Sequence, residues 1–579
     1  MKRFITFLPV IVLIVLSYWS VSPLLEPGFF SIHDDEQVGR LYELDQSIKS
    51  GHFPVRISQN LGFGYGYPLF NFYPPFVYYV AEVFVLFGIG YIASVELMIG
   101  LGFLLAAYFM YIFSKEYLGK YGGLVAAVVY TYVPYHAVDV YVRGALPEFW
   151  SFVFVPAIFW AYKKLADTKK PLYLILSGIF FTCLILTHNL VAMMSGIFIA
   201  MYLLFLLWET TEKKRFMQQV ALSGLIGLTL SASFWIPSFF ERNTTMIKLL
   251  TMESADYNQH YVYLRQLWNS AWGYGGSLPG PEDGLTFQIG KVHIIGSILA
   301  GIAGLWLYLK KNTSWKILFL FIAMFSLATF MMTFHSDFVW DNLQFFAYIQ
   351  FPWRFLLFTA FASSFLVGAL VLVIKSERIK AIVAAVLMIG TVFFYKDYFT
   401  PKEYFKNVTD TDYINLDVIK WKTSIMAFEY VPNGVATKET NFGTKIDITK
   451  EQVATSSYTV IKGDIRLKEE SIKPHYKKYF VSGSGGIVRI NQFSYPGWNV
   501  FIDMNEVTYS DNNRLKLLQF NVPSGNHSIE VKYTDTPARM LGNVLSATSI
   551  IGILLYIILI LLRKNKTSHH GKNKKRKNK

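Results

Sequence analysis

Three consecutive acids follow a histidine near the start of a chain in which only 16% of the residues are charged. Apolar residues spaced three and four apart from Val38 predict a helix directly behind this motif. A helix N-terminus stabilises negative charge, so the carboxylates are expected to stay ionised, as a general base or a metal ligand requires. Capping alone would need one acid, and the larger cluster favours a chemical role. The motif consists of His33, Asp34, Asp35 and Glu36.

Further polar candidates lie at the ends of apolar segments. Asp139 and Arg143 are four residues apart and share a face if this stretch is helical. Glu148 opens an apolar run, and His188 lies in a tight turn between two runs. Arg354 precedes another run, where its guanidinium could bind phosphate through two hydrogen bonds. A local ion pair, a turn residue and a headgroup contact are the simpler interpretations. Arg56 and Tyr73 complete the substrate-binding candidates.

Several common catalytic motifs are missing from the sequence. It has no P-loop, no GxGxxG, no HExxH, and no GxSxG between a strand and a helix. These absences argue against nucleotide chemistry and against zinc or serine hydrolases, and we expect no nucleotide, pterin or haem cofactor. The single cysteine, Cys183, excludes a disulfide framework and a thiolate metal cluster. Mg²⁺ or Mn²⁺ stays open.

The elements that position these residues are membrane helices. The chain has 579 residues, 53% of them apolar, and they come in blocks of about 20, the length that spans a bilayer core. The low charge and a mean hydropathy of +0.35 exclude an ordinary cytosolic enzyme, a disordered chain and a coiled coil. We therefore predict a polytopic α-helical membrane protein of twelve spans. They lie near 4–22, 92–113, 121–138, 149–163, 172–188, 190–208, 216–237, 290–309, 315–334, 355–374, 380–398 and 541–562.

The distribution of lysine and arginine predicts the topology. Basic clusters mark alternate connections as cytoplasmic, which places both termini inside and the acidic loops outside the cytoplasmic (plasma) membrane. A further apolar run, Pro74–Gly90, is expected to be interfacial or re-entrant; if it crossed, the spans would number thirteen. The basic tail, 563–579, could bind nucleic acid, but contact with anionic membrane lipids is favoured and we expect no nucleic-acid partner.

The predicted organisation has a membrane module and an outer domain. Residues 1–398 form the module, with its main outer loops at 23–73, 238–289 and 335–354. Residues 399–540 are polar and are predicted to form an extracytoplasmic antiparallel β-domain before the last span. The alternation within His527–Tyr533 predicts one of its strands, and the glycine-rich positions 482–486 and 523–525 predict turns.

The outer motifs resemble those of a known superfamily. "HDDEQVGRLYELDQSIKSGHFPVR" resembles the first-loop motif of the GT-C superfamily of multi-pass glycosyltransferases. "GYGYPLFNFYPPF", "DVYVRGALPEF", "LTHNL" and "IQFPWRF" are similar to a bacterial and archaeal branch labelled as membrane proteins related to 6-pyruvoyl-tetrahydropterin synthase. "FSYPGWNVFID" and "VPSGNHSIEVKYTDTP" are similar to the outer β-domain of that branch and of YfhO-type proteins. The resemblance covers nearly the whole chain.

This resemblance implies a polyprenyl-phosphate-sugar-dependent glycosyltransferase. Asp35 would act as the base on the acceptor, with Asp34 and Glu36 beside it and Asp139 as a second acid. Asp35 and Asp139 would also be the ligands of a Mg²⁺ or Mn²⁺ ion, if one is bound. Arg354 and Arg143 would hold the lipid phosphate, and His188 would contact the donor. The implied partners are an undecaprenyl-type lipid-linked sugar donor and a cell-wall polymer or glycolipid acceptor.

Two alternatives to this function stay open. The chain lacks the WWDYG-type motif of oligosaccharyltransferases and a clear Asp-x-Asp in its second outer loop. A flippase or transporter of lipid-linked sugars could use the same outer charges, although its spans would be expected to carry charge at mid-membrane depth. A non-catalytic cell-envelope assembly protein is the other alternative.

Overall fold

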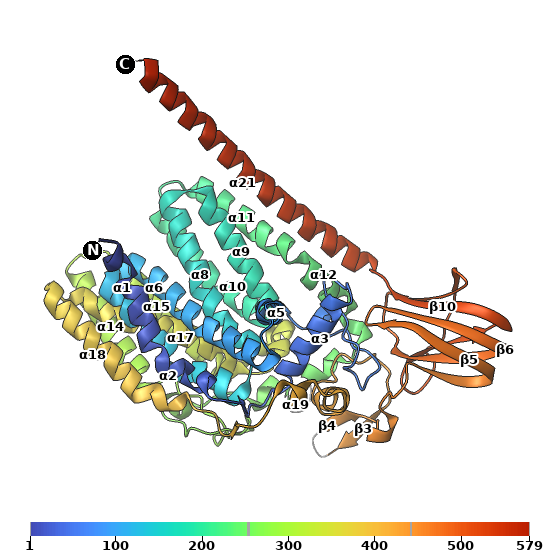
Figure 1. The fold of residues 1–579 in the computed structure, drawn as a ribbon. Coiled ribbons are helices and arrows are strands. Elements are labelled where there is room, and N and C mark those ends of the chain that lie inside the picture. Colours follow the sequence, from blue (N-terminus) through green and yellow to red (C-terminus); the bar gives the residue numbers. More distant parts are fainter. Residues whose placement is uncertain (1, 252–254, 441–442, 578–579) are drawn as a thin grey trace.

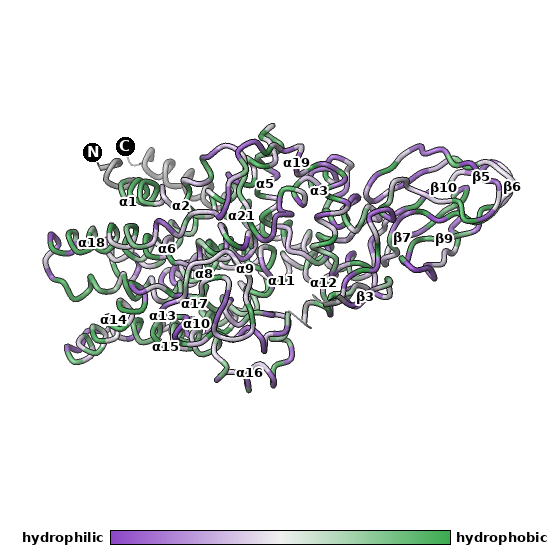
Figure 2. The backbone as a smooth tube through the Cα atoms, turned by 90° about the horizontal axis from the view of Figure 1, so that it is seen from below, coloured by the Kyte–Doolittle hydropathy of each residue, from purple (hydrophilic) through white to green (hydrophobic). Residues whose placement is uncertain are grey.

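A computed structural model describes residues 2–577, except 252–254 and 441–442. The chain is mostly helical, and a separate β-sheet domain lies at one end of the helical body (Figure 1). Apolar residues concentrate in the helices, whereas the β-domain mixes apolar and polar residues (Figure 2). The predicted fold class, a helical membrane protein with an antiparallel β-domain before its last helix, is confirmed at this level.

A helix occupies each of the predicted apolar runs. The run at 216–237 is bent by 67° between α11 and α12 (Ala232–Glu241). The runs 92–113 and 121–138 share α6, which loses helical geometry at Gly119 (φ 70°, ψ −176°). The other bounds are α1 (Lys2–Leu16), α6 (Tyr91–Thr131), α8 (Leu146–Thr168), α9 (Pro171–Thr187), α10 (Asn189–Glu209), α11 (Lys213–Leu230), α14 (Lys291–Leu309), α15 (Trp315–Met331), α17 (Leu356–Ala369), α18 (Glu377–Tyr395) and α21 (Pro537–Lys577).

The number of membrane crossings is not fixed by these helices. In the described chain, six helices are long and apolar enough to cross a membrane, or nine if each of three bent pairs forms one span. The twelve crossings therefore stay a prediction. Helix α5 (Phe76–Leu86) lies in the run at 74–90 and has 11 residues. At 1.5 Å per residue it extends for about 16 Å, roughly half the thickness of a bilayer core.

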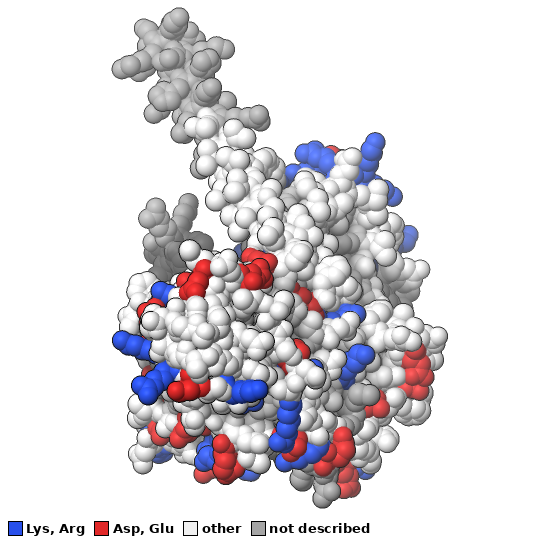
Figure 3. Space-filling model, turned by 90° about the vertical axis from the view of Figure 1, so that its right-hand side faces the viewer, with Lys and Arg blue, Asp and Glu red and all other residues white. Residues whose placement is uncertain are grey.

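Helix α17 lies at the centre of the body and α21 at its edge. Every residue of α17 is buried, and it packs against α6, α14 and α15. Gly122 and Gly368 allow this contact, since a Cβ on Gly368 would lie 2.5 Å from the Gly122 carbonyl oxygen. The part of α21 that stands clear of the molecule shows no charged side chain before its grey end (Figure 3). Such an apolar surface suits contact with lipid. The side chains of the predicted basic tail, 563–579, lie outside the described part.

The β-domain is an antiparallel sheet with the strand order β5-β6-β10-β7-β8, and β9 pairs with β6. In β10, Ile529, Val531 and Tyr533 are buried, as their alternation predicts. Acidic and basic side chains are mixed on the end face of the molecule (Figure 3). The strands are β5 (Tyr458–Lys473), β6 (Tyr476–Phe493), β7 (Trp498–Ile502), β8 (Asn505–Val507), β9 (Leu517–Val522) and β10 (Gly525–Tyr533).

One predicted turn of this domain is wrong. Residues 482–486 lie inside β6, and the glycines serve a close approach of two strands: a Cβ on Gly486 would lie 2.0 Å from the Lys462 carbonyl oxygen of β5. The other glycine-rich segment, 523–525, does connect β9 to β10.

Residues 399–457 connect the helical body to the sheet. Strand β2 (Tyr404–Phe405) pairs with β1 (Phe29–Phe30) of the first outer loop. The segment continues through α19 (Asp410–Ile414), α20 (Ser424–Met426) and the hairpin of β3 (Thr437–Thr440) and β4 (Gly443–Ile446). The sheet thus takes up only the second half of the region predicted as a β-domain.

A buried ion pair fastens the last helix to α12. Arg539 donates from Nη2 and Nε to Glu241, at 2.6 and 3.1 Å, and the two side chains are 1% and 7% exposed. Asn71 and Thr536 also donate to Glu241. This network joins α12, the first outer loop and the chain that leaves the β-domain.

Replacing Arg539 with methionine is expected to destabilise the protein by about 3–5 kcal/mol, because it leaves the Glu241 carboxylate buried without its cation. The double variant E241Q/R539M should recover part of that loss, since it removes the unpaired charge. Unfolding of purified protein in nanodiscs measures both. K380M, which breaks an exposed pair with Glu377, is the control and should change stability little. Equal stability of R539M and wild type would contradict the prediction.

Candidate functional site

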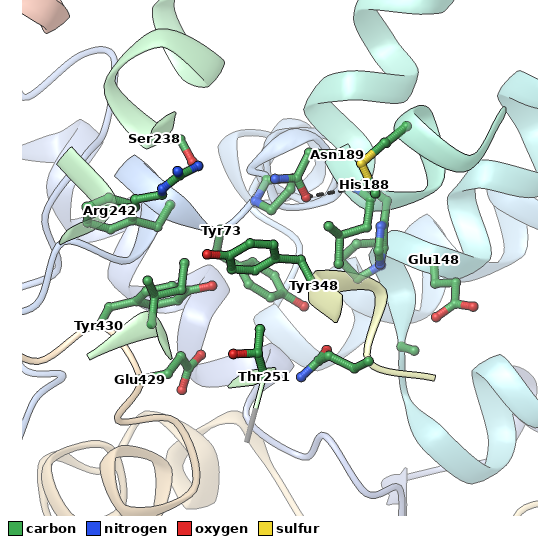
Figure 4. A pocket seen from close by; sticks show the side chains of 18 of the residues that line it. Tyr73, Glu148, His188, Asn189, Ser238, Arg242, Thr251, Tyr348, Glu429 and Tyr430 are labelled. Carbon is green, nitrogen blue, oxygen red and sulfur yellow. Dashed lines mark hydrogen bonds between the residues drawn. The ribbon is translucent and has the colours of Figure 1, made fainter. Parts of the chain in front are cut away.

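A cavity of about 960 Å³ opens where the segments predicted to be outer loops meet. Its walls come from the first outer loop, the turns before α8 and α10, the end of α12, the segment before α17 and residues 426–430 (Figure 4). These segments are far apart in sequence, and their convergence puts most of the predicted site residues around one space. Among the predicted residues, the lining contains Asp34, Glu36, Tyr73, Arg143, Glu148, His188 and Arg354.

The first outer loop supplies the acidic side of the cavity. Helix α3 (Gln37–Lys49) begins directly after Glu36, so the acids precede the helix and none caps it through its side chain. Glu36 pairs with Arg40 one turn later, at 2.8 Å between Oε1 and Nη2. The Arg40 guanidinium also lies 4.4 Å from the centre of the Tyr73 ring. Gln37 Nε2 donates to the Gly144 carbonyl oxygen at 2.7 Å, which joins α3 to the second outer loop.

Backbone hydrogen bonds position Asp34 beside Arg143. The N–H groups of His33 and Asp34 donate to the carbonyl oxygens of Val142 and Arg143, at 3.0 and 2.9 Å. Burial and the nearby Glu36 together raise the pKa of Asp34 to about 7, against the lowering effect of Arg143 and other arginines. Among the described residues, none donates a hydrogen bond to the Asp34 carboxylate. Asp34 is thus a half-buried carboxyl that titrates near neutral pH and faces the cavity.

Glu148 connects two arginines of the lining. Its Oε2 accepts from Arg143 Nη1 at 2.9 Å and from Arg354 Nε at 3.2 Å. Its Oε1 accepts a short hydrogen bond from the Tyr135 hydroxyl. Arg143 also pairs with Asp139 at 2.5 Å, within the π-helical turn η2 (Val138–Arg143). The four charges form one buried network in which the two arginines are already paired.

His188 contributes a hydrogen-bond donor to the cavity. It is the N-cap of α10, and its Nδ1 accepts from the Val191 N–H at 3.2 Å. Because a backbone N–H can only donate, Nδ1 carries no proton, and the neutral ring holds its proton on Nε2. This nitrogen lies on the side of the ring away from the helix, and the residue lines the cavity. His188 is therefore suited to donate to a ligand oxygen and not to act as a base.

Two variants separate capping from ligand binding at His188. Asparagine is a good N-cap but has no group that reaches the position of Nε2. H188N should keep wild-type stability, whereas H188A should lose about 1 kcal/mol. Both should reduce kcat/KM by about threefold to tenfold, because both lose the Nε2–H donor. Full activity of H188N would reduce the role of His188 to capping.

Four predicted site residues lie outside the lining. Asp35 is exposed, and the partial desolvation of its carboxyl and Glu36 raise its pKa against the lowering effect of Lys422. Asp139 is buried and pairs with Arg143. His33 is exposed and lies 3.0 Å from the Tyr274 carbonyl oxygen. Arg56 is buried at the junction with the last helix, where it donates to Asn71, Ser233 and Asn543. The structure therefore brings Asp34, rather than Asp35, to the cavity.

The structure adds lining residues that the sequence interpretation missed. Arg40 carried a detectable signal, since it lies four residues after Glu36 on the predicted helix. Arg242 and Glu429 gave no such signal, because neither has a residue of opposite charge three or four positions away. Aromatic rings surround them in Figure 4. These additional residues are Arg40, Trp235, Arg242, Tyr348, Glu429 and Tyr430.

The predicted metal ligands do not come together. Across the described chain, no group of three or more His, Cys, Asp and Glu side chains is placed to hold a metal ion. Asp139 pairs with Arg143, and Glu36 pairs with Arg40, so cations already occupy the positions beside these carboxylates. Mg²⁺ or Mn²⁺, which the sequence left open, stays an expectation that no cluster of three or more such side chains among the described residues supports.

Comparison with known proteins gives one family match. Residues 70–264 match the family described as "6-pyruvoyl-tetrahydropterin synthase related domain; membrane protein". The resemblance expected from the motifs is confirmed for this segment. The matched third of the chain includes Tyr73, Arg143, Glu148, His188 and Arg242 of the cavity lining. No curated protein matches the chain.

Two solved structures resemble the fold. One is the crystal structure of the Archaeoglobus fulgidus oligosaccharyltransferase in the apo form, with 14% identity and a TM-score of 0.40 over 69% of this chain and 57% of that one. The other is the same enzyme in complex with Zn and sulfate, with 13% identity and a TM-score of 0.38 over 68% of this chain and 53% of that one. This chain thus spans little more than half the length of these structures, and at such scores the likeness says nothing about its activity.

Proposed function

We propose that this protein is a membrane glycosyltransferase that transfers a sugar from a polyprenyl-phosphate donor to an acceptor at the extracytoplasmic face. The single observation that carries the proposal is the cavity, which combines a half-buried carboxyl of pKa about 7 with arginines and aromatic rings. A carboxylate that titrates near neutral pH suits a general base, and arginines suit phosphate. The GT-C-like motifs of the outer loops agree with this chemistry.

The reaction would be a direct displacement. Asp34 accepts the proton of the acceptor hydroxyl, and the hydroxyl oxygen forms a bond to the anomeric carbon of the sugar. The bond between that carbon and the phosphate oxygen breaks, and its electron pair leaves with the polyprenyl phosphate. The arginines of the lining neutralise the developing negative charge. The anomeric carbon is inverted, and Asp34 afterwards releases its proton to water.

The donor and acceptor follow from the placement of the site in the chain. The cavity lies among the segments that the basic clusters predict to be outside, where nucleotide sugars are scarce and lipid-linked sugars are accessible. Aromatic side chains such as Tyr73, Tyr348 and Tyr430 offer faces for a sugar ring. A cell-wall polymer or a glycolipid is the proposed acceptor. The β-domain, joined to the cavity through residues 426–430, is proposed to help in holding it.

The test is release of the lipid product. Purified protein in nanodiscs is incubated with a panel of undecaprenyl-phosphate sugars, and undecaprenyl phosphate is measured by mass spectrometry. Release from at least one donor supports the proposal, and release from none, with donor binding intact, would favour a flippase or an assembly protein. A chelator arm addresses the metal: since Glu36 and Glu148 pair with arginines and the described residues form no cluster of metal ligands, EDTA is expected to leave the rate unchanged.

A further inference from the structure

Arg242 is the cation of the lining that differs from the other three. Arg40 pairs with Glu36, Arg143 with Asp139 and Glu148, and Arg354 with Glu148. Each of these carboxylates would compete with an incoming anion. No acidic side chain of the described chain pairs with Arg242. An anion that enters the cavity can therefore bind Arg242 without displacing a carboxylate.

The surroundings of Arg242 hold its guanidinium at the cavity wall. It follows the last residue of α12, and its guanidinium carbon lies 4.4 Å from the centre of the Phe239 ring and 6.0 Å from that of Tyr348. Glu241, the adjacent acid, is occupied by the buried network with Arg539. Figure 4 shows Arg242 beside Ser238, on the opposite side of the cavity from Glu148. The cavity therefore has an unpaired cation at Arg242 and, on the side of Glu148, arginines that are already paired.

The wall near Arg242 is apolar. Phe239 lies against the Arg242 guanidinium, and the lining of the cavity as a whole also contains Leu190 and Met193 of α10, Trp235 of α12, and Phe345. Phe239 and Phe240 are 53% and 66% exposed on the outer surface of α12, directly after the 67° bend from α11. An exposed apolar surface that leads to an unpaired cation matches a ligand with an apolar chain and an anionic head.

We propose that Arg242 binds the phosphate of the lipid-linked donor, and that the lipid chain lies along the apolar surface of α10 and α12. This inference rests on the proposed function and deepens it, because it assigns the phosphate to Arg242 instead of Arg143 and Arg354. The paired arginines then serve to hold Glu148 and the loop of Asp34. The sugar extends from Arg242 across the cavity toward Asp34.

Binding of undecaprenyl phosphate, without a sugar, tests the assignment. Wild type, R242A and R242Q are compared in nanodiscs, with undecaprenol and inorganic phosphate as the other two ligands. We expect both variants to weaken undecaprenyl phosphate binding by about tenfold to a hundredfold, as for the loss of a charge-assisted contact. Undecaprenol binding should not change, because it lacks the anion. R215A, which removes an exposed arginine paired with Glu212 at the start of α11, is the matched control.

The outcomes separate this inference from the proposed function. Unchanged undecaprenyl phosphate affinity in folded R242A and R242Q would overturn the assignment, and turnover by wild type would still support the transferase. Equal loss for undecaprenol would also overturn it, because the effect would then come from the apolar wall. Inorganic phosphate binding that depends equally on Arg242 would point to a soluble anion in place of a lipid. If wild type released no product but showed the predicted binding pattern, the lipid site would stand and the transferase would fall.

Discussion

The D34N variant is expected to reduce glycosyl transfer by about a hundredfold to ten-thousandfold, the contribution typical of a general base. Asparagine keeps the shape of Asp34 but cannot accept the proton of the acceptor hydroxyl. The matched control is D35N, one residue along, because Asp35 is exposed and lies outside the cavity lining. Release of undecaprenyl phosphate measures both variants. A severe loss in D35N with activity kept in D34N would return the base to Asp35.

The pH dependence follows from the same carboxyl. Burial and Glu36 raise the pKa of Asp34 to about 7, so the base form increases as the pH rises through 7. kcat/KM of wild type should rise over this interval and level off above it. The effect of Asp34 on stability has the opposite sign. The folded state binds this proton more tightly than the unfolded state, so stability falls as the pH rises from 3.8 to about 7, and the loss is complete above that. At pH 8, D34N should therefore unfold at no lower temperature than wild type.

The scarcity of charge made much of the candidate site predictable. Polar and charged residues at the ends of apolar segments are rare in this chain, so each of them was a candidate for a functional role. Glu148, His188 and Arg354 were selected in this way, and all three line one cavity. It could not distinguish Asp34 from Asp35, since both belong to the same motif. The choice depends on two backbone hydrogen bonds to Val142 and Arg143, more than 100 residues away in the sequence. No local pattern encodes such a contact.

Other features could not be predicted from the sequence, because they depend on the direction in which a side chain or a helix points. Glu241 and Arg242 look like one charged pair at the end of a span, yet the first is buried against Arg539 and the second faces the cavity. Apolar runs predicted the positions of the helices, because hydrophobicity and length are local properties. They did not predict the break at Gly119 or the bend before Ala232, which arise where helices pack and change direction.

The second large effect is expected at Glu148. Alanine at this position leaves Arg143 and Arg354, whose side chains are 11% and 10% exposed, next to each other without the carboxylate between them. Loss of a buried partner of this kind costs about 3–5 kcal/mol. Glutamine should be only a partial substitute, because Arg143, Arg354 and Tyr135 all donate and its amide NH₂ is itself a donor. Denaturant unfolding in detergent or nanodiscs measures the loss.

The control for Glu148 is E212Q, which breaks an exposed pair with Arg215 and should change stability little. The double variant E148A/R354M should be more stable than E148A alone, since it removes one of the two repelling cations. If Glu148 has a structural role, stability and activity should both fall in E148A and both recover in E148A/R354M. This expectation requires that a residue other than Arg354 binds the phosphate. If E148A/R354M recovered its stability but not its activity, Arg354 would contact the substrate itself. The assignment of the lipid phosphate to Arg242 instead of Arg354 would then be wrong.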